Sequence, residues 1–532
     1  HDGHNSTLLA VNADTGEILF GANEERYTIV KNQGGFPFRT FEIAKKTLNF
    51  TNINVKNIYF STKTLPFIPD SKKYKIKSLF DFLNWFTPKE IFKNRFVTNV
   101  YLFISSYLRK KQTYKDLRKI NLINPKVHFI NHHNCHSLSA LAFTKSSLEE
   151  PVLIFTLDGS GDASSGSINI FSKRNLINLK TIHTLDSLGE IYTQITALLN
   201  MKPMEHEFKL MGLAPYCMQK YSLKVYHQLI RKFVKINRDE NNNIFWESIT
   251  GKWGYALRSS LRKELKYFRF DAIASGAQLL IEKSISPWVN NYIKSTGINN
   301  VAFAGGIFMN IKLNKLITEN EKVKQFTFVP SSGDESLVFG SWIYSLLRNK
   351  NFGLDYIDCL KNKLDNYGLL IGNHYDNSSI RKEINESLDG IEFSIIDKKD
   401  EILKKVTQLL IDGNIGARFM GRMEIGARSL GNRSIICSAA SFNQTHKINK
   451  AIKSRDFWMP FAPVVLDTEA IKLFNIAEDN INEYQYMQIA VESTEYAKKN
   501  ISAALHPYDK TARPQILFRH TNPKFYELIE SF

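Results

Sequence analysis

Two histidines and an aspartate occur close together in the sequence and could hold a metal ion. His132 and His136 are four residues apart, a spacing that places both side chains on one face of a helix. Residues 152–157 form an apolar run typical of a buried strand, and Asp158 follows it directly. Because α/β folds place their chemistry at the carboxyl ends of central strands, these residues predict a two-histidine, one-carboxylate metal site. Ordinary histidines beside a structural turn are the alternative interpretation.

Glycine-containing turns follow several predicted strands and could bind phosphate. One spans residues 158–162, a second contains Gly305 and Gly306, and a third contains Asp334. Glycines in a turn between a strand and a helix let backbone N–H groups approach an anion. Turns repeated in this way are the plan of the two-lobed actin-like ATPases, the ASKHA class. In such a fold Asp334 could supply a second carboxylate, besides that of Asp158, to the metal ion.

An arginine- and glycine-rich segment predicts a site for an oxyanion. Residues 421–434 contain Arg422, Arg428 and Arg433 between three glycines. Guanidinium groups bind phosphate or carboxylate through paired hydrogen bonds, and glycines allow close approach. Further cations follow in residues 451–463, which include Lys453 and Arg455, and at Arg513. A solvated basic loop is the alternative interpretation.

Size and composition limit the kind of protein. A chain of 532 residues is too long for one core, so two or three domains are expected. The net charge of +18 suits phosphates and nucleotides, but also nucleic acid or an anionic membrane surface. None of the four cysteines forms a CxxC pair, which argues against a zinc finger or a disulfide framework. No apolar run is long enough to span a membrane and no signal peptide is visible, so a cytoplasmic location is expected.

The order of predicted elements divides the chain in two. The first part, residues 1–355, alternates strands and helices and contains a basic, aromatic segment at about 66–119. We interpret that segment as a helical insertion with a solvated lysine face, and as a substrate lid or anionic-surface contact in the alternative. A new α/β pattern begins at 356, with strands expected at 368–372, 391–396 and 415–419.

The motifs together resemble the NodU/CmcH-type O-carbamoyltransferases, the family of the tobramycin, cephamycin, ansamycin and nodulation-factor enzymes. Matching stretches follow one another along nearly the whole chain: 24–37, 132–136, 157–161, 209–216, 304–314, 333–334, 421–434, 453–463 and 513–515. The resemblance implies an α/β architecture: a two-lobed ASKHA domain over 1–355, related to the domain that transfers threonylcarbamoyl to tRNA adenosine, and a YrdC-like domain over 356–532.

The resemblance also implies a reaction. The YrdC-like domain would combine carbamoyl phosphate with ATP to give carbamoyl-adenylate. The ASKHA domain would then move the carbamoyl group to a hydroxyl of a natural product or sugar and release AMP. Iron (Fe²⁺) or another divalent metal would occupy the transfer site, with Mg²⁺ as a further candidate alongside ATP.

Site residues are carried over by motif. The metal ligands would be His132, His136, Asp158 and Asp334, and His4 would be the catalytic base toward the acceptor hydroxyl. The residues expected to contact nucleotide or carbamoyl phosphate are Lys209, Gly305, Gly306, Asn310, Arg428, Arg433, Lys453 and Arg513.

Three departures from the family pattern stand out. Ile29 replaces an arginine and Asn32 a frequent histidine, so acceptor contacts are expected to differ. The usual His-x-Asp-Gly-Thr motif is replaced by residues 506–511, which lack the glycine. The sequence ends at Phe532, before the family's Asn-Thr-Ser-Phe-Asn segment, so we expect the YrdC-like domain to be incomplete as printed.

Alternative functions remain at this stage. An ASKHA-type kinase would leave the arginines of 421–433 without a role, and a tRNA threonylcarbamoyl-transfer enzyme is favoured only by the positive charge. An enzyme of hydrogenase-maturation carbamoyl transfer would be expected to contain CxxC zinc modules. A binding module without enzymatic activity would give the candidate His, Asp and Arg site residues no function. The expected partners are ATP, carbamoyl phosphate and a small hydroxyl acceptor, without nucleic acid. A homodimer is left open.

Overall fold

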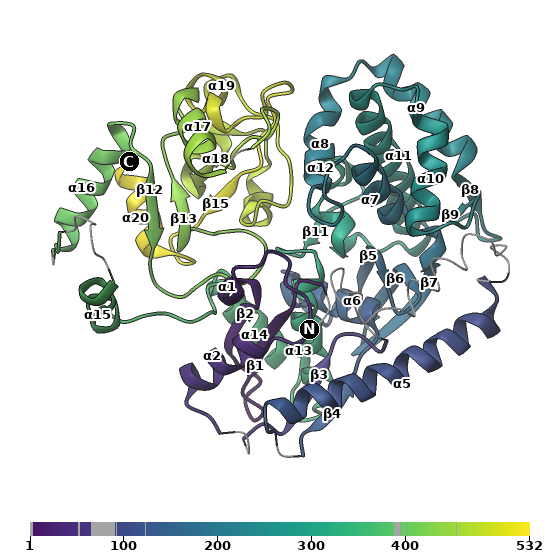
Figure 1. Cartoon of the computed structure of the whole chain (residues 1–532), viewed down its shortest axis with the longest axis horizontal. Helices are drawn as coiled ribbons and strands as arrows, with labels where there is room; N and C mark the ends of the chain where they lie inside the picture. Colours follow the sequence, from purple (N-terminus) through teal and green to yellow (C-terminus); the bar gives the residue numbers. More distant parts are fainter. Residues whose placement is uncertain are drawn as a thin grey trace. The chain divides into compact units, whose positions relative to one another are not determined.

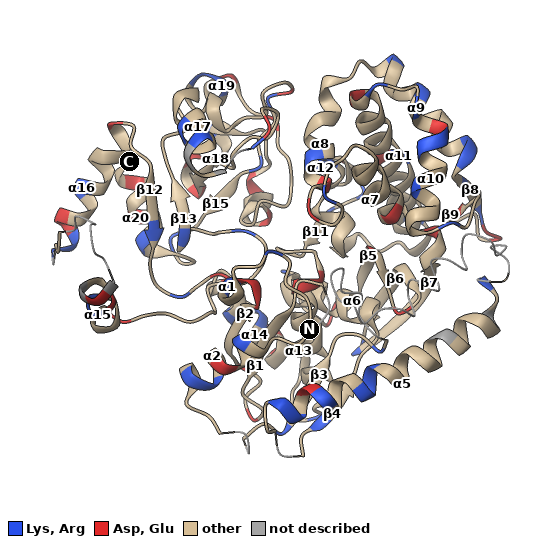
Figure 2. Cartoon of the chain, in the orientation of Figure 1, with Lys and Arg blue, Asp and Glu red and all other residues tan. Residues whose placement is uncertain are grey.

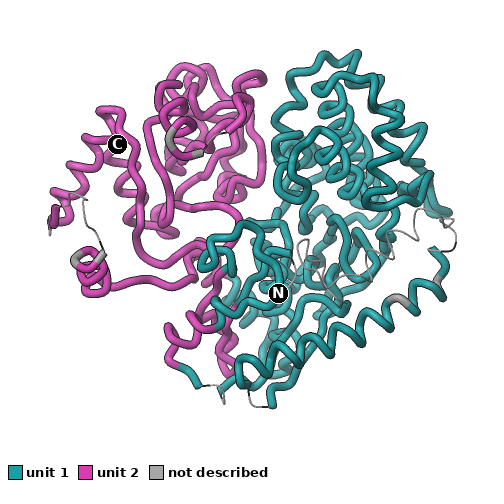
Figure 3. Tube along the Cα trace, viewed as in Figure 1, with its two compact units in different colours: residues 1–8, 23–41, 50–361 teal, residues 9–22, 42–49, 362–532 magenta. Residues whose placement is uncertain are grey.

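The chain folds into two compact units, which are described separately. The computed structural model describes residues 4–51, 54–64, 91, 93–122, 124–387, 394–396, 398–453 and 455–532. Unit 1 contains His1–Leu8, Asn23–Phe41 and Phe50–Lys361. Unit 2 contains Leu9–Ala22, Glu42–Asn49 and Asn362–Phe532, so two short N-terminal pieces belong with the C-terminal part (Figure 3).

Unit 1 is built around a five-stranded sheet, the largest sheet among the described residues. Its strand order is β11-β10-β5-β6-β7, and β5 pairs in parallel with β10 and antiparallel with β6 (Figure 1). The apolar run at the start of β5 is buried throughout, as expected for a strand inside a sheet covered on both faces. The strands are β5 (Val152–Gly161), β6 (Ser164–Ser172), β7 (Asn175–His183), β10 (Asn300–Ala304) and β11 (Gln325–Phe328).

Strand β5 is longer than the sequence indicates. We expected a turn from Asp158 onward, but β5 runs on to Gly161, with a shift in its pairing to β6 after Leu157. The reversal falls instead at Asp162 and Ala163, whose φ angles are 49° and 63°. Two consecutive positive φ angles define the tight hairpin turn that suits the twist of antiparallel strands. Asp158 therefore lies at an irregularity within a strand.

Helix α6 (His132–Phe143) packs on the sheet and against helix α13 (Leu337–Arg348). It begins where the Asn131 side chain accepts a hydrogen bond from the N–H of Asn134, an arrangement that satisfies a donor at the helix start. The contact with α13 is close: a Cβ added to Gly340 would lie 1.9 Å from the carbonyl oxygen of Cys135. Small residues thus let α6 sit deep in unit 1, with ten of its twelve residues buried.

The first part of the chain contains further helices and strands. Only helix α5 (Arg95–Lys119) of the expected insertion at 66–119 is fully traced, and residues 65–90 lie outside the described part of the chain. The other elements are β1 (Thr7–Val11), β2 (Ile18–Asn23), α1 (Glu25–Thr28), α2 (Phe38–Leu48), β3 (Asn57–Phe60), β4 (Lys126–Phe129), α7 (Leu188–Leu198), α8 (Glu207–Leu213), α9 (Gln219–Lys232), β8 (Val234–Arg238), β9 (Ile244–Ser248), α10 (Gly254–Leu265), α11 (Phe270–Thr296), α12 (Ile311–Thr318) and α14 (Leu354–Asn366).

Besides most of the β1–β2 sheet, unit 2 contains two small two-stranded sheets in its described residues, and together with unit 1 it gives a mixed α/β protein. Strands β12 and β13 pair antiparallel, and β14 and β15 pair parallel. Its named elements include α15 (Asn377–Ser387), α16 (Lys399–Ile411), β12 (Gly416–Phe419), β13 (Arg433–Ile436), α17 (Phe442–Ile448), β14 (Val464–Leu466), α18 (Ala470–Leu473), α19 (Glu495–Asn500), β15 (Gln515–Leu517) and α20 (Pro523–Ser531).

Two strands expected in unit 2 differ from the structure. Residues 368–372 form a turn and an extended segment outside any strand, because Gly368 and Leu369 adopt φ angles of 53° and 63°. Of the strand expected at 391–396, residues 394–396 are not in a strand and the rest lies outside the described residues. The expected strand at 415–419 is confirmed as β12.

Charge is distributed over many elements. Figure 2 shows Lys and Arg on helices of both units, α5, α9 and α16 among them. Among the described residues, no helix is both long and apolar enough to cross a membrane.

Candidate functional site

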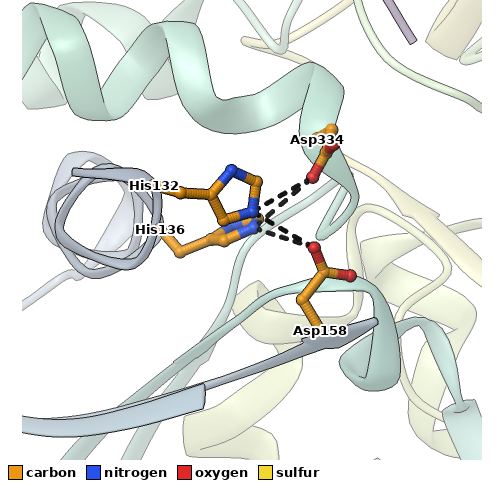
Figure 4. Close-up of side chains that lie close together, drawn as sticks. All are labelled: His132, His136, Asp158 and Asp334. Carbon is orange, nitrogen blue, oxygen red and sulfur yellow. Dashed lines mark hydrogen bonds and ion pairs between the residues drawn. The ribbon is translucent and has the colours of Figure 1, made fainter. Parts of the chain in front are cut away.

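Four side chains named from the sequence as metal ligands come together in unit 1. His132 and His136 project from one face of α6, Asp158 from β5, and Asp334 from the loop after β11 (Figure 4). One ligand atom from each residue lies within 4.8 Å of every other. The helical spacing of the histidines and the position of Asp158 directly after the apolar run of β5 therefore produce the predicted cluster.

The distances within the cluster suit a single ion. Nε2 of His132 lies 3.2 Å from Oδ2 of Asp158 and 3.6 Å from Oδ1 of Asp334. Nε2 of His136 lies 3.6 Å from each of the same two oxygens. Ligands held at about 2.1 Å from a metal in tetrahedral or octahedral geometry lie roughly 3.0–3.5 Å apart. Two imidazoles and two carboxylates suit iron, manganese or zinc, so the donor set leaves the metal's identity open.

The surroundings of His136 also favour an ion. Its side chain is fully buried, and neither ring nitrogen has a hydrogen-bond partner among the described residues. Burial disfavours a charged ring, but the nearby carboxylates of Asp158 and Asp334 outweigh burial and raise the pKa of His136 to about 9. The same two carboxylates would attract a metal cation, which would replace the proton on the ring.

Backbone contacts fix the orientation of Asp158. The N–H of Gly306 donates a hydrogen bond of 3.3 Å to Oδ1, which leaves Oδ2 directed at the histidines. Gly305 has a φ of 99°, and a Cβ there would lie 2.2 Å from the carbonyl oxygen of Leu157. Burial and the charge of Asp334 both oppose ionisation, yet His132 and His136 hold the pKa of Asp158 below its ordinary value. The double glycine therefore supports the cluster, a role that its sequence motif did not indicate.

The neighbouring His133 behaves differently. Its Nδ1 lies 3.0 Å from the hydroxyl of Thr156, and its Nε2 lies 3.1 Å from the carbonyl oxygen of Ser164. Both ring nitrogens are thus satisfied within the protein, and burial lowers the pKa of His133 to about 3. His133 is a neutral structural histidine that holds α6 against the sheet.

His4 and Lys209 lie in the same unit as the cluster. His4 is half-buried, and its charge acts on the carboxyl of Glu207, the first residue of α8. Burial is the main influence on Glu207 and raises its pKa, while His4 acts in the opposite direction. Lys209 is half-buried on α8. Their roles in catalysis and nucleotide binding remain predictions.

The amide of Asn310 is used within the protein. Its Oδ1 accepts a hydrogen bond of 3.1 Å from the N–H of Leu313 at the start of α12. The same amide exchanges two hydrogen bonds with Gln278, which in turn accepts one from the hydroxyl of Tyr192. Nucleotide contact by Asn310 therefore stays a prediction, and the structure shows a cap on α12.

Arginines gather in unit 2. Arg513 is partly buried, and loss of solvation followed by repulsion from the charges of Arg428 and Arg455 lowers the pKa of its guanidinium well below the ordinary value. Burial likewise lowers the pKa of Arg455. Since clustered cations repel each other, a bound anion would relieve the strain. Arg455 was noted as a cation in its motif but was absent from the residues predicted to bind a ligand.

A buried carboxylate shapes the arginine-rich loop. Oε1 of Glu424 accepts hydrogen bonds from the N–H groups of Leu430, Asn432 and Arg433 at 2.8–2.9 Å. The Glu424 side chain is fully buried, so these bonds are shielded from water. Sequence reasoning missed this residue because a glutamate among arginines resembles an ordinary surface charge.

Two other predicted anion-binding residues have different surroundings. The Arg433 guanidinium donates to the carbonyl oxygens of Met420, Asn432 and Gly421 and lies 3.7 Å from the centre of the Phe419 ring. These contacts bind Arg433 to its own loop. Lys453 closes a short helical turn, and its side chain lies outside the described residues.

Comparison with family models first defines the class of protein, an enzyme that transfers carbamoyl groups. Residues 2–343 match the carbamoyltransferase N-terminus, and residues 407–532 match the carbamoyltransferase C-terminus. The chain therefore belongs to the carbamoyltransferase family, which confirms the resemblance noted in its motifs.

Relatives extend along most of the chain. An uncharacterised protein of Methanocaldococcus jannaschii, MJ1051, is 29% identical over 99% of this chain and 88% of its own length. The nodulation protein NolNO of Sinorhizobium fredii is 27% identical over 76% of this chain and 57% of its own length. The 3′-hydroxymethylcephem-O-carbamoyltransferase of Streptomyces clavuligerus is 29% identical over 24% of this chain and 23% of its own length.

Proposed function

We propose that this carbamoyltransferase makes carbamoyl-adenylate from carbamoyl phosphate and ATP and transfers the carbamoyl group to a hydroxyl of a natural product or sugar. Activation belongs to the C-terminal part, a YrdC-like domain over 356–532. Transfer belongs to the N-terminal part, an ASKHA-type domain over 1–355. A hydroxyl acceptor is supported by the name of the cephem relative, which describes transfer to a hydroxymethyl group.

The arginine cluster of unit 2 carries the activation half of the proposal. Carbamoyl phosphate is a small dianion, and Arg513 lies close enough to Arg428 and Arg455 for their charges to depress its pKa. A cluster of cations that repel one another favours a compact anion, because binding offsets the repulsion. An enzyme that acted only as an ASKHA-type kinase would have no use for this cluster.

The His/Asp cluster of unit 1 carries the transfer half. His132, His136, Asp158 and Asp334 would hold a divalent cation, for which we favour Fe²⁺ on the family resemblance. Such an ion, when bound, supplies a positive charge that orients phosphate oxygens and offsets negative charge on a departing AMP. Both imidazoles are buried, so bulk water is kept away from the histidine side of the site.

His4 would act as the base for transfer. The acceptor oxygen forms a bond to the carbamoyl carbon, the bond from that carbon to the AMP phosphate oxygen breaks, and His4 takes the acceptor's proton. Imidazole is the side chain that most often serves as a general base in enzymes. His4 is half-buried, so part of its side chain is accessible to solvent. Placement of His4 and Asn5 beside the cluster is supported by the hydrogen bond from Asn5 to Glu335.

Isotope exchange between ATP and labelled pyrophosphate tests the proposal. In the proposed activation, water cleaves carbamoyl phosphate to phosphate and carbamate, and a carbamate oxygen attacks the α-phosphorus of ATP with release of pyrophosphate. Exchange should therefore require carbamoyl phosphate. Mass spectrometry of hydroxyl compounds incubated with the enzyme, ATP and carbamoyl phosphate should then show the gain of one carbamoyl group. Exchange that is absent, or that proceeds without carbamoyl phosphate, would contradict the activation step.

A further inference from the structure

The carboxylate of Asp162 joins two separate segments beside the candidate metal centre. Its Oδ2 accepts a hydrogen bond of 2.8 Å from the backbone N–H of His132. Its Oδ1 accepts from the hydroxyls of Thr62 and Thr64, at 2.9 and 2.8 Å, and from the N–H of Thr64 at 2.8 Å. The N–H of Lys63 lies 3.1 and 3.0 Å from the two oxygens. One carboxylate therefore ties residues 62–64 to the first residue of α6.

The position of Asp162 at a helix start strengthens this contact. His132 is the first residue of α6, where backbone N–H groups have no partner within the helix. A carboxylate at that end is favoured both by the hydrogen bond and by the helix dipole. The contact therefore fixes the backbone from which the His132 side chain projects.

The residue before Asp162 fixes the ring itself. A Cβ added to Gly161 would lie 2.2 Å from two ring carbons of His132 and 2.7 Å from its Nδ1. The close contact requires glycine at this position. Backbone conformation does not, because Gly161 has no positive φ. The imidazole thus rests directly on the backbone of β5, with Nε2 directed at Asp158 and Asp334.

We propose that Asp162 is a positioning residue for the metal centre, acting through His132. It holds the backbone of His132 while Gly161 supports the ring, so that Nε2 is placed for an ion before the ion binds. The proposal rests on the metal centre described under the proposed function. Residues that orient ligands in this way typically change metal affinity ~10–100-fold when they are replaced.

Asp162→Asn is the sharpest test, because asparagine tolerates the φ of 49° and preserves the hairpin turn. The substitution removes the charge and one of the two acceptor oxygens. Asp358→Asn is a matched control in the same unit. Asp358 also accepts from a backbone N–H, that of Leu148 at 2.9 Å, from the Ser147 hydroxyl at 2.9 Å, and from Lys361 at 2.7 Å.

Cobalt(II) titration against a competing chelator gives the affinity, and the visible absorption of bound Co²⁺ reports ligand geometry. We expect wild type and Asp358→Asn to bind Co²⁺ equally, and Asp162→Asn to bind ~10–100-fold more weakly with an altered spectrum. Equal affinity and an unchanged spectrum for Asp162→Asn would overturn the positioning role while leaving the metal centre intact.

Two further outcomes are possible: the Asp162→Asn variant fails to fold, or the wild-type protein binds no metal. If Asp162→Asn does not fold, Thr64→Val removes one hydroxyl donor to Asp162 and should weaken Co²⁺ binding to a smaller degree. An unchanged affinity in Thr64→Val would then count against the proposal. If wild type itself takes up neither Co²⁺ nor Fe²⁺, the metal centre is wrong and the positioning role falls with it.

Discussion

The side-chain amide of Asn5 donates a hydrogen bond of 3.0 Å to the buried carboxylate of Glu335. Asn5 follows His4 in the chain, and Glu335 follows Asp334, so the bond links the segment of the proposed base to that of a proposed metal ligand. The other carboxylate oxygen of Glu335 accepts from the hydroxyl of Ser331. Two segments that lie 330 positions apart are thereby held together at the site.

Replacing Asn5 with glycine should weaken both stability and transfer. Glycine adopts the φ of 56° found at Asn5 without strain, so the change isolates the loss of the hydrogen bond. A buried carboxylate that loses a donor should cost about 1–3 kcal/mol of unfolding free energy in urea titrations. Asn242→Gly, at an exposed turn with φ 62°, is the control and should change little. Equal losses in the two variants would contradict the role of the bond.

His4→Asn should separate the two half-reactions. Exchange of labelled pyrophosphate into ATP should continue in the presence of carbamoyl phosphate, because the residues proposed for activation lie in unit 2. Carbamoylation of an accepted hydroxyl compound should fall by ~10²–10⁴, the usual contribution of a general base. Product formation at the wild-type rate would exclude His4 as the base.

Arg513→Gln should abolish the response to carbamoyl phosphate without destabilising the fold. The substitution removes a partly buried cation that Arg428 and Arg455 repel, so the free protein should be as stable as wild type or more so. Thermal unfolding of wild type should shift upward when carbamoyl phosphate binds the native state, and the shift should vanish in the variant. Arg433→Gln is the contrast: it should lose stability, since Arg433 donates to backbone carbonyls of its own loop. A retained shift in Arg513→Gln would place the anion elsewhere.

The carboxyl of Glu282 predicts a stability change that depends on pH. Burial is the main influence and raises its pKa above 4.5, although Gln278 donates to it at 2.8 Å. Because the native state binds this proton more tightly than the unfolded state, Glu282 destabilises the protein as pH rises through its native pKa. Glu282→Gln should therefore gain stability over wild type at pH ~7.5, and the gain should disappear below pH ~4.5. Urea titrations at the two values measure this, and a gain of equal size at both would refute it.

Local patterns predicted the parts of the fold that depend on local physics. The apolar run of β5 and the four-residue spacing of His132 and His136 each depend on a single element, and both are confirmed as structure. The segment 368–372 shows the limit of such patterns. Its apolar composition suggested a strand, but the positive φ of Leu369 turns the chain there.

Residues that support the sites were not visible in the sequence. Asp162 accepts hydrogen bonds from residues 98–100 positions away in the sequence. Glu424 accepts hydrogen bonds from backbone N–H groups of the arginine-rich loop. The hydrogen-bond donors to Asp162 and to Glu424 follow no sequence spacing that a motif could reveal. Arg455 was noted only as an extra cation, since its relation to Arg513 depends on how distant segments pack.

Two histidines of α6 that are three residues apart, His133 and His136, should behave in opposite ways toward metal. His136→Gln removes a buried ligand and should reduce bound Fe²⁺ or Co²⁺ to a small fraction of one equivalent. His133→Gln should retain the metal and lose only stability, because His133 is satisfied by Thr156 and Ser164. Metal analysis after gel filtration distinguishes them. Loss of metal from both variants alike would show that α6 as a whole, rather than the ligand, had been disturbed.

Anomalous diffraction from crystals grown with Fe²⁺ tests most directly whether these four side chains hold one cation. We predict a single peak in unit 1, about 2.0–2.2 Å from Nε2 of His132 and His136 and from carboxylate oxygens of Asp158 and Asp334. A peak at other residues, or imidazoles that point into different surroundings with no peak between them, would contradict the metal centre.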